Sequence, residues 1–406
     1  MLSVEEALTR ILSEITLLNT IKVQLPDALG QVLAEDVVAQ DDIPPFANSA
    51  MDGFALLSKD SKARDGNPPR LRVTGGVAAG YVADSAVEEG TAMRIMTGAP
   101  VPPGADSVIQ VELTRSAGPE SDWVEILEEV ASGNNIRPAG EDMRRGQTIL
   151  QRGSEIGAWE IGILATLGWA SVPVVRKARV AILGTGDEVI DIDEPLQPGK
   201  IRNSNSYLLE AAVRQAGAEP HRLGIARDSV ESLRAKFSEA MTYDLILTSG
   251  GVSVGDFDLV KNIMAEQGNI NFWRINMRPG KPVAFGHIGG VPLLGLPGNP
   301  VSSAVTFELF GRPVIRKMQG HTRLTRPQVE VIVEDGVQDQ AMRRHYVRAH
   351  VTWRDGRFIA RTTGNQGSHM MTSLLQANAL VIVPEGGAVV HPGDTARAIM
   401  LDWPEE

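Results

Sequence analysis

The most constraining part of the sequence runs from residue 243 to 267, where an apolar segment leads through a glycine-rich loop into an amphipathic pattern. Leu245-Ile-Leu247 is followed by Thr-Ser-Gly-Gly-Val-Ser-Val-Gly-Asp-Phe-Asp at 248–258. An apolar run before glycines and a 3.6-residue period is typical of a buried parallel strand, a tight loop and a helix N-terminus. Glycines let backbone N–H groups approach an anion, so this loop predicts an anion site.

Two carboxylates, Asp256 and Asp258, lie in the same loop. Beside a bound phosphate they would repel the ligand unless a divalent cation lay between, so the pair suggests a metal-assisted phosphate site. Helix capping explains the two aspartates equally well, because Asp is a preferred capping residue. The loop alone leaves both interpretations open.

Strands and helices alternate around the glycine loop, which predicts a parallel sheet with crossover helices. We expect strands at 179–183, 218–225 and 244–248, helices at 206–216, 229–240 and 258–267, and a hairpin of strands 282–288 and 291–296 around Gly289-Gly290. Such sheets bind ligands at the carboxyl ends of their strands, where loops 184–188, 248–258 and 296–303 would converge.

The rest of the chain divides into three further regions. Ser3-x-x-Glu6 is a capping box that opens an amphipathic helix. Short strands broken by glycine and proline predict a β lobe before residue 141, and the segment 156–167, apolar nearly all round, predicts a packed helix. Past Pro327 we expect strands at 329–333, 345–353, 357–363, 380–383 and 396–401, forming a small β barrel or sandwich.

Composition excludes several classes of function. The 406 residues include no cysteine, which rules out disulfides, thiolate zinc sites and a cysteine nucleophile, and fits a cytoplasmic protein. The net charge of −11 argues against a nucleic-acid-binding surface. No apolar run approaches the ~18 residues that span a membrane, and the N-terminus does not resemble a signal peptide.

Two common nucleotide-binding motifs are also excluded. Gly184-x-Gly186 lacks the third glycine of a dinucleotide fingerprint, because Val189 stands there, and Asp187-Glu188 would face a pyrophosphate. No G-x-x-x-x-G-K-[ST] string occurs. Asp228, three residues before Glu231, predicts a helix cap. His369 is expected to be a polar loop residue, since no second His or Cys lies near it in the sequence.

Seven strings together resemble one family. They are Asn-Ser-Ala-Met-Asp-Gly at 48–53, Met-Thr-Gly-Ala at 96–99, Arg-Pro-Ala-Gly-Glu-Asp at 137–142, Gly-Thr-Gly-Asp-Glu at 184–188, Thr-Ser-Gly-Gly-Val-Ser-Val-Gly-Asp at 248–256, Arg-Pro-Gly-Lys-Pro at 278–282 and Leu-Pro-Gly-Asn-Pro at 296–300. In order and over the whole chain, they resemble the MoeA-type molybdopterin molybdenumtransferases and, with them, the C-terminal domain of gephyrin.

The resemblance implies a multidomain α/β plus β fold. Its parts would be a central molybdopterin-binding-type three-layer α/β domain (179–326), an N-terminal elongated region (1–45 and 141–178) with a β lobe (46–140), and a small C-terminal β barrel (327–406). It further implies a homodimer, and a reaction in which molybdate and adenylylated molybdopterin give molybdenum cofactor and AMP with Mg2+ or another divalent cation. The resemblance also implies that the molybdopterin adenylyltransferase and molybdoenzyme maturation factors are partners. We expect the protein to bind neither nucleic acid nor a membrane.

Family roles fall on particular residues of this sequence. The expected catalytic residues are Asp52, Thr97, Asp142, Glu188, Asp228 and Asp258, and the expected metal ligands are Glu188, Asp256 and Asp258. Substrate or molybdate contacts are expected at Arg137, Ser249, Gly250, Gly251, Ser253, Arg274, Arg278, Lys281, Pro297, Asn299, Ser302, Arg348 and Ser368. Family members often carry lysines where this chain has Arg274 and Arg278, and Arg and Lys differ in hydrogen-bonding geometry.

Two other functions compete with this interpretation. The adenylylating enzyme of the same pathway resembles the central α/β region alone and would not need the N-terminal lobe and the C-terminal barrel. A scaffold like gephyrin would carry long linkers or extra domains, which this sequence lacks. Release of AMP from adenylylated molybdopterin, with and without molybdate, distinguishes the three.

Overall fold

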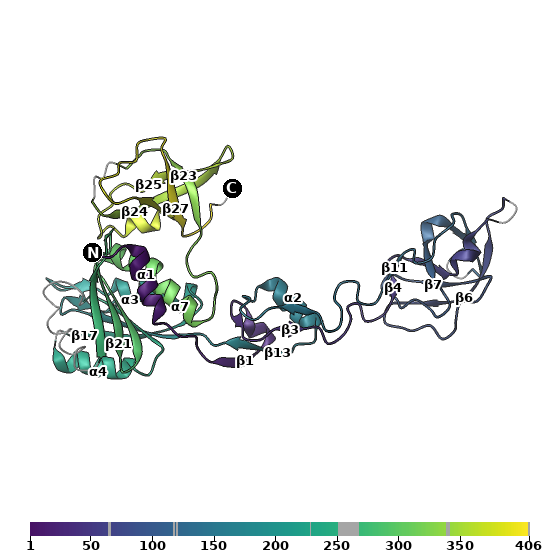
Figure 1. The fold of residues 1–406 in the computed structure, drawn as a ribbon, viewed down its shortest axis with the longest axis horizontal. Helices are drawn as coiled ribbons and strands as arrows, with labels where there is room; N and C mark the ends of the chain where they lie inside the picture. Colours follow the sequence, from purple (N-terminus) through teal and green to yellow (C-terminus); the bar gives the residue numbers. More distant parts are fainter. Residues whose placement is uncertain are drawn as a thin grey trace. The chain divides into compact units, whose positions relative to one another are not determined.

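The computed structural model describes residues 1–63, 66–116, 118, 121–227, 229–250, 268–337 and 342–404. The chain forms two compact units (Figure 1). Unit 1 comprises Met1–Glu35, Gly153–Ile161 and Ala170–Glu406, and unit 2 comprises Asp36–Arg152 and Gly162–Trp169. None of the helices in the described ranges is long and apolar enough to cross a bilayer.

A six-stranded sheet is the centre of unit 1. Its order is β17 (Glu219–Ala226), β14 (Arg179–Thr185), β18 (Leu245–Ser249), β22 (Val291–Leu296), β21 (Pro282–Ile288) and β19 (Gly268–Arg274). The first four strands are parallel, and β21 and β19 are antiparallel to their neighbours. Every residue of β18 is buried, as the apolar run predicts.

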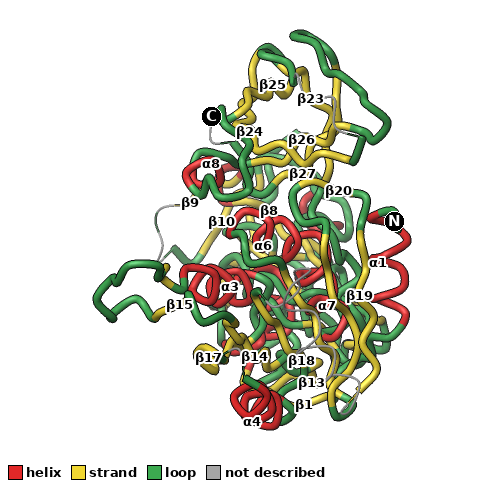
Figure 2. The backbone as a smooth tube through the Cα atoms, turned by 90° about the vertical axis from the view of Figure 1, so that its left-hand side faces the viewer, coloured by secondary structure: helices red, strands yellow, loops and turns green. Residues whose placement is uncertain are grey.

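Helices cover both faces of this sheet, so the three-layer prediction is confirmed. Leu245 and Leu247 of β18 pack in one core with α1 (Val4–Ser13), α3 (Ser204–Gln215), α6 (Pro300–Thr306) and α7 (Arg312–Met318). Ile246 faces the opposite way and packs with α4 (Val230–Ala240). Helices α3 and α6 lie side by side (Figure 2). A π-helical turn, Phe307–Gly311, joins α6 to α7.

Local signals set several element ends. The capping box of α1 is formed by Ser3 and Glu6, as predicted. Helix α4 is instead capped by Ser229, whose side chain accepts a hydrogen bond from the Ser232 N–H, so the cap predicted at Asp228 is wrong. Gly289 (φ 55°) and Gly290 (φ 83°) close the β21–β22 hairpin in the left-handed conformation that such turns require.

The C-terminal strands form a small barrel within unit 1. Its strand order is β20 (Met277–Arg278), β24 (Arg344–Arg354), β25 (Arg357–Thr362), β23 (Gln328–Val333), β27 (Thr395–Met400) and β26 (Ala379–Val383), and β26 also pairs with β24. A short helix, α8 (Thr372–Leu375), precedes β26. The barrel prediction is confirmed, with β20 added from a distant part of the chain.

Helix α2 (Ala158–Thr166) contradicts its prediction as a packed helix. Of its residues only Leu164 is buried, and Trp159 is 85% exposed. A helix that is apolar on all sides is buried only where other elements pack against every side of it. The described part of the chain does not surround α2 in this way. The neighbouring part of unit 1 is a three-stranded sheet of β1 (Thr20–Gln24), β13 (Ser171–Val175) and β2 (Val32–Leu33), and the pair β15 (Val189–Ile190) and β16 (Ile201–Arg202) follows β14.

Unit 2 is the β lobe, built on a six-stranded sheet. Its order is β8 (Ser107–Gln110), β5 (Gly53–Leu56), β7 (Thr91–Ile95), β6 (Arg70–Val77), β10 (Trp123–Ile126) and β9 (Thr114–Ser116). Two small ladders complete it, β4 (Asn48–Ser49) with β11 (Ile136–Arg137) and β3 (Val37–Val38) with β12 (Thr148–Leu150). Gly53 begins β5, and a Cβ there would collide with the Ile109 carbonyl of β8.

An ion pair at the start of β18 yields a test of stability. Asp244 accepts hydrogen bonds from both terminal nitrogens of Arg176, at 2.6 Å each, and from the Arg179 N–H at 2.8 Å. Burial alone would raise the pKa of Asp244, but the bonds from Arg176 and Arg179 outweigh it and lower that pKa below 3.8. The carboxylate therefore stabilises the fold above the unfolded-state pKa, and this contribution is lost as the pH falls through the lower folded-state value.

We expect Asp244→Asn to cost about 2 kcal/mol at neutral pH, because it removes charge-assisted hydrogen bonds from a largely buried site. The melting temperature should fall on the order of 4 °C. The difference from wild type should shrink below pH 3.8, measured by circular dichroism melts. Glu239→Gln, which alters the exposed pair with Lys236, is the control and should change little. An equal effect of both substitutions would contradict this account of Asp244.

Candidate functional site

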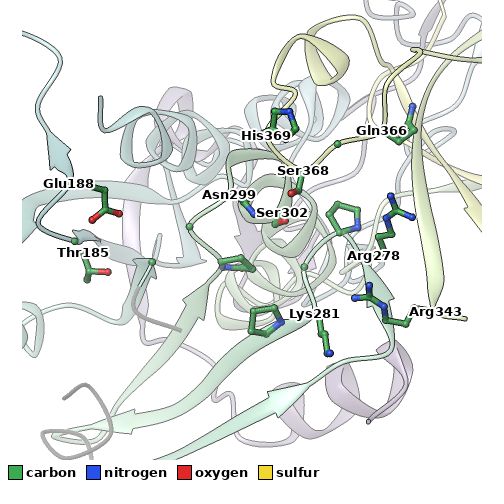
Figure 3. Close-up of a pocket in the computed structure, with 18 residues that line it drawn as sticks. Thr185, Glu188, Arg278, Lys281, Asn299, Ser302, Arg343, Gln366, Ser368 and His369 are labelled. Carbon is green, nitrogen blue, oxygen red and sulfur yellow. The ribbon is translucent and has the colours of Figure 1, made fainter. Parts of the chain in front are cut away.

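A cavity of about 620 Å³ opens in unit 1 at the carboxyl ends of the parallel strands (Figure 3). Its wall comes from the loop after β14, the end of β18, the β22–α6 loop, the segment between β20 and β21, and the barrel. The lining residues are Thr185, Gly186, Glu188, Gly250, Arg278, Pro279, Gly280, Lys281, Pro282, Pro297, Gly298, Asn299, Ser302, Arg343, Gln366, Gly367, Ser368 and His369. This is the edge of the sheet where the sequence predicts a ligand.

Close packing of the first two loops explains one of the glycines. Gly250 has φ +91°, and a Cβ on it would lie 2.7 Å from the Thr185 Oγ1 and 3.0 Å from the Thr185 carbonyl oxygen. Both the backbone conformation and the space therefore require glycine. The Thr185 hydroxyl also donates to the Ser249 carbonyl at 3.3 Å, which links the ends of β14 and β18.

Charge is divided across the cavity. Arg278, Arg343 and Lys281 lie toward one side, whereas Glu188 lies at the opposite side with Thr185 (Figure 3). Arg278 belongs to β20, which pairs with β24 of the barrel, and the Arg343 guanidinium donates to the Met277 carbonyl at 3.3 Å. An anion in this cavity would be held between three cationic side chains and the hydroxyl and amide groups of Ser302, Ser368 and Asn299.

Behind the cationic side lies a fully buried arginine, Arg348 of β24. Its Nε donates to the Ser373 Oγ at 3.0 Å, and its Nη2 donates to the Gly367 carbonyl at 3.1 Å. Its Nη1 is buried without a hydrogen-bond partner among the described residues. Burial, and secondly the charge of Arg278, lower the pKa of Arg348 to about 10, so the guanidinium still carries its charge at neutral pH.

The barrel loop that follows β25 is fixed to both Arg348 and α6. The Gln366 side chain accepts from the Arg348 N–H at 2.9 Å and donates to the Arg348 carbonyl at 3.2 Å. The Val301 N–H donates to the Ser368 carbonyl at 3.1 Å. These bonds place Ser368 and His369 in the cavity wall, and His369 lies in a loop, as the sequence predicts.

The predicted site residues of unit 1 fall into four groups. Glu188, Gly250, Arg278, Lys281, Pro297, Asn299, Ser302 and Ser368 line the cavity. Ser249 and Arg348 lie directly behind its wall, whereas Arg274 is exposed at the end of β19 and does not line it. Asp228, Gly251, Ser253, Asp256 and Asp258 lie outside the described residues. Ten lining residues were not among the predicted site residues, namely Thr185, Gly186, Pro279, Gly280, Pro282, Gly298, Arg343, Gln366, Gly367 and His369. The first six carried a signal, since they stand in strings already singled out, whereas Arg343 and Gln366 carried none.

The other predicted residues lie in unit 2. The Thr97 N–H and hydroxyl donate to the Asp52 Oδ1 at 2.7 and 2.8 Å, and these bonds, the N–H first, lower the pKa of Asp52. Arg137 is paired with Asn48 across β11 and β4, next to the segment that carries Asp52. Asp142 is exposed, and its N–H donates to the Ile43 carbonyl at 3.0 Å. The structure thus brings Asp52 and Thr97 into contact.

No group of three or more His, Cys, Asp or Glu side chains suited to a metal ion occurs in the described part of the chain. At the cavity, the oxygen donors of the first loop are the Glu188 carboxylate and the Thr185 hydroxyl. Mg2+ is commonly held by one or two carboxylates together with substrate phosphates, so these donors suit a cation that arrives with a phosphate ligand.

Comparison with known proteins gives matches along nearly the whole chain. Family models described as "MoeA N-terminal region (domain I and II)", "Probable molybdopterin binding domain" and "MoeA C-terminal region (domain IV)" match residues 2–168, 181–317 and 330–401. A protein of Bacillus subtilis (strain 168) named molybdopterin molybdenumtransferase is 37% identical over 393 residues, covering 94% of this chain and 91% of the relative.

Two further relatives agree with this assignment. Molybdopterin molybdenumtransferase 2 of Mycobacterium tuberculosis (strain ATCC 25618 / H37Rv) is 38% identical over 381 residues, covering 92% of this chain and 93% of the relative. The crystal structure of the molybdopterin biosynthesis moeA protein from Pyrococcus horikoshii OT3 superposes with a TM-score of 0.83 at 32% identity, over 98% of this chain and 100% of that one. With its models and full-length relatives in agreement, the chain belongs to the MoeA family.

Proposed function

We propose that this protein is a molybdopterin molybdenumtransferase, which inserts molybdenum from molybdate into adenylylated molybdopterin and releases AMP. The observation that carries the proposal is the division of charge in the cavity, with Arg278, Lys281 and Arg343 on one side and Glu188 on the other. The three cationic side chains suit a substrate with phosphate groups and a second, dianionic oxyanion, and Glu188 suits a cation bound to the phosphate. The names of the full-length relatives support the same activity.

The cationic side chains bind and orient the anions. Lys281 offers a point charge and Arg278 a planar pair of donors, so the two together suit the oxygens of a tetrahedral oxyanion. Arg348 adds a buried positive charge behind Lys281 and Arg278. It is not exposed to water, and its Nη1 has no hydrogen-bond partner in the described structure. A buried charge of this kind favours an anion in the cavity. The chain contains no cysteine, so the sulfurs that receive molybdenum belong to the substrate.

We include Mg2+ or another divalent cation in the proposal. Glu188, with the Thr185 hydroxyl beside it, would hold the cation, and Asp256 and Asp258 are the further ligands expected from the sequence. When bound, the ion would polarise the phosphoanhydride of the substrate. The Glu188 carboxylate lies at the end of the cavity away from Arg278 and Lys281, so a cation held there would orient the substrate between the two sides.

We also propose that the protein acts as a homodimer, in which Asp52 and Thr97 of one protomer serve the cavity of the other. The described cavity is lined by residues of unit 1, whereas Asp52 and Thr97 belong to unit 2. Helix α2 supports a second copy, because Trp159 is 85% exposed on it and Ile161 and Ile163 are only partly buried. The reaction would take place in the cytoplasm, with the adenylyltransferase and molybdoenzyme maturation factors as partners.

The activity itself is tested by incubating the protein with adenylylated molybdopterin and Mg2+, with and without molybdate. We expect AMP release that depends on molybdate, with molybdenum cofactor formed in equal amount, measured by chromatography and by reconstitution of a molybdoenzyme. An adenylyltransferase would instead consume ATP and release pyrophosphate, and a scaffold would turn over nothing. Either result would overturn the proposal.

The two sides of the cavity should be separable kinetically. We expect Lys281→Gln to raise the molybdate concentration for half-maximal AMP release roughly tenfold, because a charged donor is lost, with a smaller loss at saturation. Glu188→Gln should lower AMP release even at saturating molybdate and be partly recovered by excess Mg2+. Glu239→Gln is the surface control. The division of roles would be wrong if both variants gave the same molybdate and Mg2+ dependence.

Mixing two inactive variants tests the shared site. Asp52→Ala and Glu188→Ala alter different units, so a hybrid dimer would retain one intact site if the two residues act across protomers. After full subunit exchange at equal concentrations, we expect about a quarter of wild-type activity, because half the dimers are hybrids with one working site each. Mass-tagged subunits establish that exchange has occurred. Activity no higher than that of the separate variants, after proven exchange, would exclude a site shared in this way.

A further inference from the structure

Asn205, in the first turn of α3, connects two loops that wall the cavity. Its amide nitrogen donates to the Ser249 Oγ at 2.7 Å and to the Gly298 carbonyl at 2.7 Å. Ser249 is the last residue of β18, directly before Gly250, and Gly298 lies between Pro297 and Asn299. One side chain therefore ties the end of β18 to the β22–α6 loop.

The chemistry of the two contacts fixes the orientation of this amide. The Gly298 carbonyl can only accept, so the Asn205 nitrogen must face it, and the same nitrogen then reaches the Ser249 hydroxyl. The other amide atom, Oδ1, is buried and has no hydrogen-bond partner among the described residues. A buried acceptor without a partner is unfavourable. The Asn205 side chain therefore keeps its two donor contacts at a cost in stability.

The two hydrogen bonds of Asn205 lie immediately behind the cavity wall. Asn205 lines a hollow of about 90 Å³ that shares Thr185, Glu188, Gly250 and Gly298 with the main cavity. A Cβ on Gly298 would lie 3.7 Å from the Gly250 Cα, so the two loops are already in close approach. Small changes in the separation of these loops would be transmitted directly to the groups that face a ligand.

Asn203, two residues earlier, has a different task. Its Oδ1 accepts a hydrogen bond from the Ser206 N–H at 3.2 Å, which caps α3. It is 5% exposed and belongs to the same turn, so it experiences a similar environment. The helix start thus carries one asparagine that stabilises the helix and another that acts on the cavity loops.

The structure assigns Asn205 as a positioning residue, which holds Gly250 and the Pro297–Asn299 segment at the separation that fits the phosphate part of the substrate. This inference rests on the proposed function for the identity of the ligand. Molybdate itself would contact Arg278 and Lys281, which lie on a different segment of the cavity wall. Asn205 should therefore affect the affinity for adenylylated molybdopterin and leave the dependence on molybdate unchanged.

The test compares Asn205→Ala, Asn205→Asp and the control Asn203→Ala. We expect both Asn205 variants to raise KM for adenylylated molybdopterin roughly tenfold, with kcat and the molybdate dependence close to wild type. Asp has the size of Asn but cannot donate to the Gly298 carbonyl, so it should not rescue. Asn203→Ala should lower the melting temperature by a few degrees through loss of the cap and leave KM unchanged.

Amide hydrogen exchange of the ligand-free protein provides a measurement that does not depend on the reaction. The Gly250 N–H donates to the Leu296 carbonyl at 3.1 Å, and its exchange should accelerate in both Asn205 variants but not in Asn203→Ala. If the wild-type protein showed no molybdate-dependent turnover, the proposed function would be refuted. Faster exchange at Gly250 in the Asn205 variants would then still support the role of Asn205 in holding the two loops together. Rescue of KM by Asn205→Asp, or unchanged exchange at Gly250 in Asn205→Ala, would overturn the role assigned to Asn205.

Discussion

The cavity depends on the parallel pairing of β14, β18 and β22. Their register places Gly184 opposite Ser249 and Ser249 opposite Leu296, so the three strands end at the same level. The loops that follow therefore leave the sheet together and pack against one another, with Gly250 against Thr185. A shift of one residue in this register would reverse which side chains face each layer of the core, so the hydrophobic core protects the geometry of the site.

The charged side chains at the cavity come from two parts of the fold. Glu188 belongs to the α/β layer, whereas Arg343 and the buried Arg348 belong to the barrel or its entry, and Arg278 lies on the strand that joins them. Hydrogen bonds fix the barrel side of the cavity. The barrel loop is held by Gln366 to Arg348 and by the Ser368 carbonyl to α6. A ligand with unlike ends is thus oriented by two structural layers rather than by one loop.

Much of this was predictable from sequence, for identifiable reasons. The apolar run before the glycine loop, the Gly289-Gly290 turn and the alternation of strands in the tail are local signals, and each gave the observed element. Six of the eight predicted residues that reach the cavity come from strings of glycine, proline and polar residues, whereas Ser302 lies in α6 and Ser368 in the barrel loop. The family and the fold class followed from those strings taken together.

The errors and omissions concern contacts that no local pattern records. Arg343 and Gln366 reach the cavity only because the barrel packs beside the α/β layer. Helix α2 has the composition of a core helix, yet burial depends on what surrounds it. Ser229 rather than Asp228 caps α4, a choice between neighbours that propensity does not make. The roles of Asp228, Asp256 and Asp258 stay predictions, since those residues lie outside the described structure.

The segment 274–278 joins three parts of the chain that are far apart in sequence. Leu2 forms a parallel bridge with Ile275, and Met277 and Arg278 pair with Arg344 and His345 of the barrel. The barrel is thus continuous with the backbone that carries Arg278, although in sequence it begins some fifty residues later, near Pro327. A chimaera that exchanged the barrel between relatives at that point would leave one strand of the sheet behind. Recombination within this family is therefore constrained by a strand pairing that crosses the apparent domain boundary.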